Sequence, residues 1–242
     1  LVGGDGGPGW TYLLNHSPAL GGVTLLVTLL VAFGVSAATA RFLGVRAGLG
    51  AAGMTLIAPA LQGGEIVEIV RWADAPGLWL RLAIEGALVA GVAFVGAVLL
   101  TRVAHRDDPM SPAERQERAR SHLTEGAIGA ACALGVGAVA GWVLAREPLK
   151  GQMLAAGFAA GVCGMGAARV IVPRAPIPAV VLGVMLLAVV GPALGLAIAG
   201  GRALRAVYEQ RVPAIATPTP VDWLAGALLG MPIGPSWALS AI

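Results

Sequence analysis

The chain has 242 residues, of which 57% are hydrophobic and only 12% are charged, and its formal net charge is +3. Soluble domains carry about 25% charged residues, so this chain has too few charged side chains to cover a water-facing globule. Its basic excess is small and no nucleic-acid-binding motif occurs, so we expect no nucleic-acid partner. The composition suits lipid as the solvent, because apolar surface needs no burial there.

Long apolar windows decide the class of membrane protein. Windows of about 18 or more residues recur along the chain, and each is long enough to cross the roughly 30 Å hydrocarbon core as a helix. A transmembrane barrel would instead show short strands in which polar and apolar residues alternate. We therefore predict an all-α, polytopic transmembrane helical bundle with about six spans and with membrane lipids as partners.

A Gly-rich segment, 1–19, precedes the first unit of three spans, 20–101. The expected spans in this unit are 20–40, 47–61 and 77–101. The second is short, so we expect it to include part of "GGEIVEIV" or to be tilted, re-entrant or broken.

Residues 102–125 form the clearly soluble part of the chain. "SPAE", from Ser111, has the form of a capping box with proline at the first helical position, which predicts a short helix. The helix would place Arg115, Arg118 and His122 on one face. We favour a solvated connector over the alternative, a helix lying on anionic lipid headgroups.

The second unit, 126–200, contains expected spans at 126–145, 152–172 and 177–200. A Pro-rich tail, 201–242, follows and includes an apolar stretch interrupted at "MPIGP". This stretch is either a broken seventh span or a helix lying at the membrane interface, and we favour the interpretation that it does not cross.

The basic residues in the connections give a weak orientation. Nine of them follow the first, third and fifth spans, against seven on the other side. The positive-inside rule then places the 102–125 loop in the cytoplasm. We expect a multi-pass protein of a membrane such as the bacterial inner membrane.

Two similar stretches hint at an internal duplication. "VRAGLGAAGM" begins at Val45 and "LKGQMLAAGF" begins at Leu149, and the same offset matches Gly91 with Gly195. Because a repeat of three spans reverses its orientation in the second copy, this pattern would give a 3+3 inverted repeat. Chance similarity is the stronger alternative in a chain that contains 36 glycines.

Glycine pairs with GxxxG spacing predict helix contact faces, because small residues let backbones approach closely in lipid. The contacts could lie within one chain, which we favour, or build a homo-oligomer or a larger membrane complex. The pairs are Gly137/Gly141, Gly157/Gly161 and Gly191/Gly195.

A group of charges stands among the apolar runs: Glu65, Glu68, Arg71, Arg81 and Glu85. Spacings of three and four residues allow Glu68 to pair with Arg71 and Arg81 with Glu85 on a helix. Glu85 lies about 12 Å into its span at 1.5 Å per residue, where a lone charge is costly and needs a partner. We favour a structural ion pair over the functional alternative, in which the group lines a path for a cation or proton.

Signs of an enzyme are few. His16, His105 and His122 lie outside the expected spans, Cys132 and Cys163 behave as small apolar residues, and no hydrolase, zinc-protease or nucleotide-binding motif occurs. We expect no catalytic residue, no cofactor and no metal ligand. The leading hypothesis is a small transporter or channel subunit for an ion or small solute, and the alternative is a non-catalytic structural or assembly subunit of a membrane complex.

Overall fold

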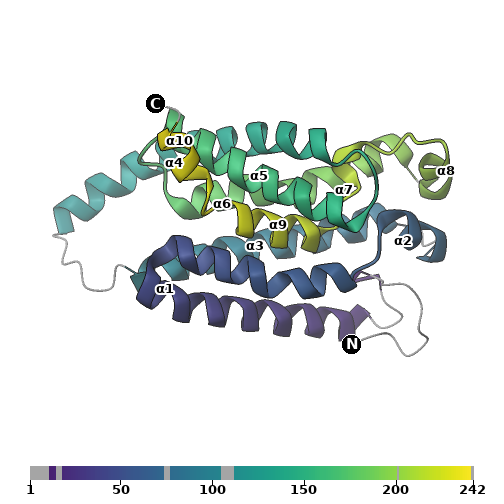
Figure 1. The fold of residues 1–242 in the computed structure, drawn as a ribbon, viewed down its shortest axis with the longest axis horizontal. Coiled ribbons are helices and arrows are strands. Elements are labelled where there is room, and N and C mark those ends of the chain that lie inside the picture. Colours follow the sequence, from purple (N-terminus) through teal and green to yellow (C-terminus); the bar gives the residue numbers. More distant parts are fainter. Residues whose placement is uncertain (1–10, 15–17, 74–76, 105–111, 201, 241–242) are drawn as a thin grey trace.

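A computed structural model describes residues 11–14, 18–73, 77–104, 112–200 and 202–240 (Figure 1). Within these residues the chain is helical and contains no strand, which confirms the predicted all-α bundle. The elements are α1 (Pro18–Gln62), α2 (Ile66–Ala73), α3 (Leu78–Ala104), α4 (Pro112–Leu144), α5 (Lys150–Ile171), α6 (Ile177–Met185), α7 (Leu187–Ala199), α8 (Ala203–Tyr208), the 3-10 turn η1 (Ala214–Ala216), α9 (Pro220–Gly230) and α10 (Gly234–Ser240).

Five helical stretches among the described residues are long and apolar enough to cross a membrane, with mean hydropathy between 1.6 and 2.5 in their best windows. The chain is therefore a multi-pass membrane protein. The stretches are Ala19–Gln62, Leu78–Ala104, Leu123–Leu144, Lys150–Ile171 and Ile177–Ala199.

The first of these stretches is a hairpin of two helical arms. The backbone leaves the helical region at Gly44 (φ 86°, ψ 170°), a conformation that favours glycine, and Figure 1 shows the chain turning back there. The Ser36 hydroxyl donates to the Gly48 carbonyl across the hairpin at 2.5 Å. The second arm, 45–62, is about 27 Å long at 1.5 Å per residue. It does not include the "GGEIVEIV" segment, part of which forms the separate helix α2.

Helix α4 joins two features that we expected to be separate. It runs from Pro112 to Leu144 without a break, so the expected helix of the 102–125 loop continues into the fourth span. Ser111 of the predicted capping box lies outside the described residues, as do the side chains of Arg115, Arg118 and His122.

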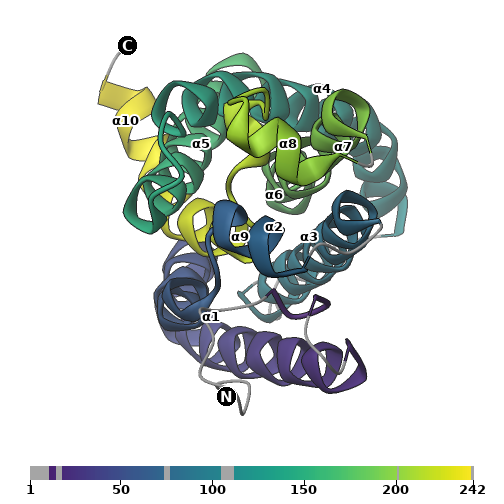
Figure 2. The ribbon, with the colours of Figure 1, turned by 90° about the vertical axis from the view of Figure 1, so that its right-hand side faces the viewer.

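The C-terminal tail, 202–240 in the structure, packs inside the helix bundle. Helix α9 lies in the centre of the bundle between the second arm of α1 and α5 (Figure 2), and every residue from 218 to 228 is buried. After a break at 231–233, α10 continues along α5, where a Cβ on Gly166 would lie 3.2 Å from the Gly234 carbonyl. The tail is a broken segment packed inside the bundle, and neither α9 nor α10 is among the stretches long enough to cross a membrane. The favoured prediction that the tail does not cross therefore stays a prediction.

The six glycines with GxxxG spacing all lie where segments of this chain touch. A Cβ on any of them would come within 3.2 Å of a neighbouring atom. These contacts are therefore made within the chain. Gly137 faces Ala160, Gly141 faces Trp223, Gly157 faces Asp222, Gly161 faces Ala227, Gly191 faces Ile215, and Gly195 faces Trp79.

The two similar stretches lie on opposite sides of α9. Gly50 and Gly53 of the first lie against Pro232 and Leu229, whereas Gly157 of the second and Gly161, farther along α5, lie against Asp222 and Ala227. The second arm of α1 therefore runs antiparallel to α9 and α5 runs parallel to it, which meets the direction requirement of an inverted repeat. Gly91 has no neighbour within 4 Å while Gly195 contacts a tryptophan ring, so the repeat stays a prediction.

Replacing Gly161 with alanine should lower the unfolding free energy by about 1–3 kcal/mol, because the added methyl group would meet the Ala227 carbonyl. Gly135→Ala is the control, since Gly135 is exposed on α4 with no neighbour within 4 Å. Thermal or denaturant unfolding in detergent measures the stability of both variants. Equal stability of the two variants would contradict the close approach of α5 and α9.

Candidate functional site

Glu85 is turned into the bundle. It is the eighth residue of α3, about 10 Å from the helix start, and it is 1% exposed. Its Oε2 accepts a hydrogen bond from the Leu13 N–H at 3.1 Å. Its Oε1 is buried and has no hydrogen-bond partner among the described residues.

Arg81 does not pair with this carboxylate, so the predicted Arg81–Glu85 ion pair was wrong. The Arg81 side chain is exposed on the outer surface of α3, whereas Glu85 faces inward. Arg81 is the fourth residue of the helix, so its long side chain can extend to the membrane interface at little cost. Spacing along a helix brings two residues near each other but does not require them to share the buried face.

A short turn at residues 11–14 covers Glu85. Thr11 and Leu14 are buried, at 5% and 3% exposure. Leu14 packs in an apolar cluster that includes Ile66 and Leu82, and burial raises the pKa of Tyr12 above its usual value. This packing holds the Leu13 N–H against the carboxylate, so the N-terminal segment forms part of the site.

A small pocket lies beside Glu85, with space for about one water molecule. Two of its oxygen atoms, Glu85 Oε1 and Thr11 Oγ1, are buried without a hydrogen-bond partner among the described residues. The Thr11 side chain is also close enough to interact with the Glu85 carboxylate, so the pocket is lined by a hydroxyl and a carboxylate that lie next to each other. The residues that line it are Thr11, Tyr12, Pro59, Ala60, Gly63, Glu85, Thr219 and Val221.

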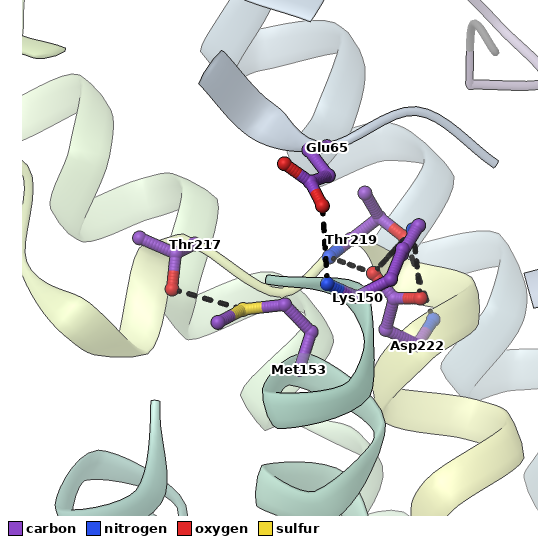
Figure 3. Close-up of polar contacts among 6 residues, drawn as sticks. All are labelled: Glu65, Lys150, Met153, Thr217, Thr219 and Asp222. Atoms are coloured by element: carbon purple, nitrogen blue, oxygen red, sulfur yellow. Dashed lines mark hydrogen bonds and ion pairs between the residues drawn. The ribbon is translucent and has the colours of Figure 1, made fainter. Parts of the chain in front are cut away.

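A second polar group surrounds the start of α9 (Figure 3). The Lys150 ammonium lies 2.9 Å from both carboxylate oxygens of Asp222. The two side chains are 15% and 1% exposed. Asp222 Oδ2 also accepts from the Thr219 N–H at 2.9 Å and the Thr219 hydroxyl at 2.7 Å. The Thr219 hydroxyl oxygen in turn accepts from the Asp222 N–H at 3.4 Å, and this bond together with the Thr219 N–H bond makes the capping box of α9, which has Pro220 at its first turn.

Glu65 connects this group to the link between α1 and α2. Its Oε1 accepts from the Lys150 backbone N–H at 3.2 Å (Figure 3). A carboxylate at this position stabilises the positive end of the α5 dipole. Lys150 therefore joins three parts of the chain: the Glu65 link, the start of α5 and the start of α9.

The structure does not assemble the five predicted charges into one path. Glu65 and Glu85 lie at the two polar groups described above. Glu68 is half-buried on α2, Arg81 is exposed, and the Arg71 guanidinium lies 5.6 Å from the aromatic ring at the end of α8.

The sequence reasoning missed Lys150, Thr219 and Asp222 as a group. "TPVD", from Thr219, has the same capping-box form as "SPAE", so this signal was present. The ion pair had no such signal, because Lys150 and Asp222 are 72 residues apart.

No family model, curated protein or solved structure matches the chain. Among the described residues, no group of three or more His, Cys, Asp and Glu side chains is placed to hold a metal ion through those ligands alone. The chemistry of the site therefore rests on the two polar groups.

Lys150→Met should lower the unfolding free energy by about 3 kcal/mol, because it leaves the Asp222 carboxylate buried without its counter-charge. Asp222→Asn should lower it less, since an amide oxygen can still accept from Thr219. The double variant should be more stable than Lys150→Met alone. Denaturant unfolding in detergent tests the cycle, and purely additive losses would show that the pair is not coupled.

Proposed function

We propose that this protein is a small transporter or channel subunit for an ion or small solute, with its polar site at Glu85. The observation that carries the proposal is the Glu85 carboxylate, which is 1% exposed and has one oxygen without a partner beside a small pocket. Ionisable groups inside membrane spans are costly and commonly mark ion or proton pathways.

The broken segment supports this function. Transporters commonly bind their substrates where a discontinuous helix ends inside the bundle. Here α9 begins at the capping box of Thr219 and Asp222, and Thr219 also lines the Glu85 pocket. The pocket therefore lies at the end of a helix that stops within the protein.

Thr219 links the two polar groups. It lines the Glu85 pocket, and its N–H and hydroxyl donate to Asp222. The Lys150 side chain that pairs with Asp222 is 15% exposed, so this ion pair is partly accessible from outside the bundle. A proton or cation that reaches Glu85 would pass close to these groups.

The alternative is a structural or assembly subunit of a membrane complex or homo-oligomer. The glycine faces offer it little support, because the chain already uses them internally. The apolar side chains that remain exposed, such as Leu30 at 72% and Phe42 at 85%, are also those expected to face lipid. The flux measurement below decides between the two functions.

We also propose that the protein resides in a bacterial inner membrane with the 102–125 loop in the cytoplasm. The N-terminal turn, α2, α8 and the start of α9 lie at the opposite end of the bundle from the bend of the α1 hairpin and from α10 (Figure 1). Since the start of α4 lies at the Gly44 end, the Glu85 site would open toward the extracytoplasmic side.

Reconstituted protein should produce a current after a concentration jump of Na⁺, K⁺, H⁺ or Cl⁻, measured on a solid-supported membrane. Glu85→Gln should reduce the current at least about tenfold, because the amide lacks the charge that the ion or proton needs. Glu68→Gln is the matched control, since Glu68 is half-buried on α2 outside the pocket, and this variant should give the wild-type current. The absence of any current from folded protein would favour the assembly function.

Orientation can be measured by labelling a cysteine placed at Arg118 in a Cys132→Ala/Cys163→Ala background. The label should react in inverted vesicles but not in intact cells, because the positive-inside rule retains this loop in the cytoplasm. Reaction in intact cells with an impermeant reagent would reverse the assigned orientation.

A further inference from the structure

We propose that the pocket beside Glu85 binds one small monovalent metal cation, with Glu85 Oε1 and Thr11 Oγ1 among its ligands. This inference rests on the proposed transport function and names the substrate class of the same site. It starts from two buried oxygen atoms that lack hydrogen-bond partners among the described residues and line one pocket.

The pocket wall supplies the oxygen ligands that hard cations prefer. A carboxylate and a hydroxyl are contributed by Glu85 and Thr11. Pro59 and Ala60 line the same pocket, and their carbonyl groups share the single N–H of Gly63, at 3.2 and 3.1 Å. Each of these carbonyls has two lone pairs, so both retain acceptor capacity.

The charge of the site favours a cation. A buried carboxylate is strongly unfavourable without a counter-charge, and Arg81, the nearest base along α3, is exposed. The Lys150 ammonium lies 2.9 Å from both oxygens of Asp222, which already compensates its charge. A bound cation would neutralise Glu85 as well.

The size and charge of the site favour a monovalent ion. The pocket has space for about one water molecule and contains one carboxylate, that of Glu85. Ca²⁺ takes six to eight oxygen ligands, commonly from several carboxylates, and Mg²⁺ keeps several of its waters. One carboxylate with a hydroxyl in a narrow space matches neither requirement.

The Leu13 N–H and the cation would use different oxygens of the same carboxylate. Oε2 accepts from Leu13 at 3.1 Å, which fixes the carboxylate and leaves Oε1 at the pocket. The turn at 11–14 therefore serves the site twice: its backbone orients Glu85 and its Thr11 hydroxyl is a ligand. A variant that removes only the hydroxyl tests the ligand role with little change in shape.

The test is binding of ²²Na⁺ to the purified full chain in detergent, with choline chloride maintaining ionic strength. Wild type and Glu68→Gln should bind about one Na⁺ with the same affinity. Thr11→Val should weaken binding at least about tenfold, and Glu85→Gln should abolish it. Unlabelled Na⁺ should displace the label much better than Ca²⁺, because the site has a single carboxylate. Gel filtration and thermal unfolding confirm that each variant is folded.

Each outcome bears on the inference. No saturable Na⁺ binding to folded wild type, binding that survives in Glu85→Gln, an unchanged affinity in Thr11→Val, or equal displacement by Ca²⁺ would overturn it. If Na⁺ binds as expected but no ion crosses a reconstituted membrane, the cation site stands and the transport function fails. If an ion other than Na⁺ gives a Glu85-dependent current and ²²Na⁺ does not bind, transport stands and this inference fails.

Discussion

The Lys150–Asp222 ion pair makes it possible for a short helix to begin inside the bundle. In lipid, every backbone polar group must be satisfied within the protein, and the first N–H groups of a helix have no intrahelical partner. Asp222 and Thr219 satisfy this requirement at α9 through a reciprocal capping box. Lys150 neutralises the buried carboxylate at 2.9 Å, and its own N–H is satisfied by Glu65. The start of α9, the start of α5 and the α1–α2 link are thus fixed by one connected polar group.

The rest of α9 depends on close backbone contact. A Cβ on Gly157 would lie 2.8 Å from the Asp222 carbonyl, and Gly226 and Gly230 on α9 meet the α5 backbone in the same way. On the other side of α9, Gly53 lies against Leu229. Packing between small residues is a main source of helix association in lipid, where apolar burial gives little drive. The capping group sets where α9 begins, and the glycines determine how closely its neighbours approach.

Hydropathy predicted most of the fold because a membrane span is a local property of sequence. Helices occupy all six expected spans among the described residues, with the first two joined at Gly44 into one of the five stretches long and apolar enough to cross. The tail could not be assigned this way, since α9 has only 11 residues and a span needs about 20. Its position depends on contacts with α1 and α5, which are far away in sequence.

The candidate site was only partly predictable for the same reason. Its buried acid, Glu85, could be recognised from its depth in an apolar run, but its hydrogen-bond partner comes from Leu13, 72 residues earlier. The pairing with Arg81 was inferred from helical spacing alone, and spacing does not tell which face of α3 meets lipid. The Lys150 N–H lies 85 residues from the Glu65 carboxylate that it contacts. Such partners are set by how the helices pack.

The same packing restricts how the proposed transport could occur. The Glu85 pocket lies near one end of the bundle, beneath the turn at 11–14. From there toward the other end, residues 218–228 are all buried. An ion that crossed this buried core without any movement of the protein would meet apolar surroundings that cannot solvate its charge. Transport would therefore require α9 or the turn at 11–14 to move. Where α9 meets α5 and the second arm of α1, glycines make many of the close contacts, which suits the small sliding of packed helices by which many proteins switch. The N-terminal end of α9 has the opposite character, because its capping box and ion pair resist displacement. Movement of α9 would therefore pivot at Asp222, next to the pocket, and be largest toward the break at 231–233.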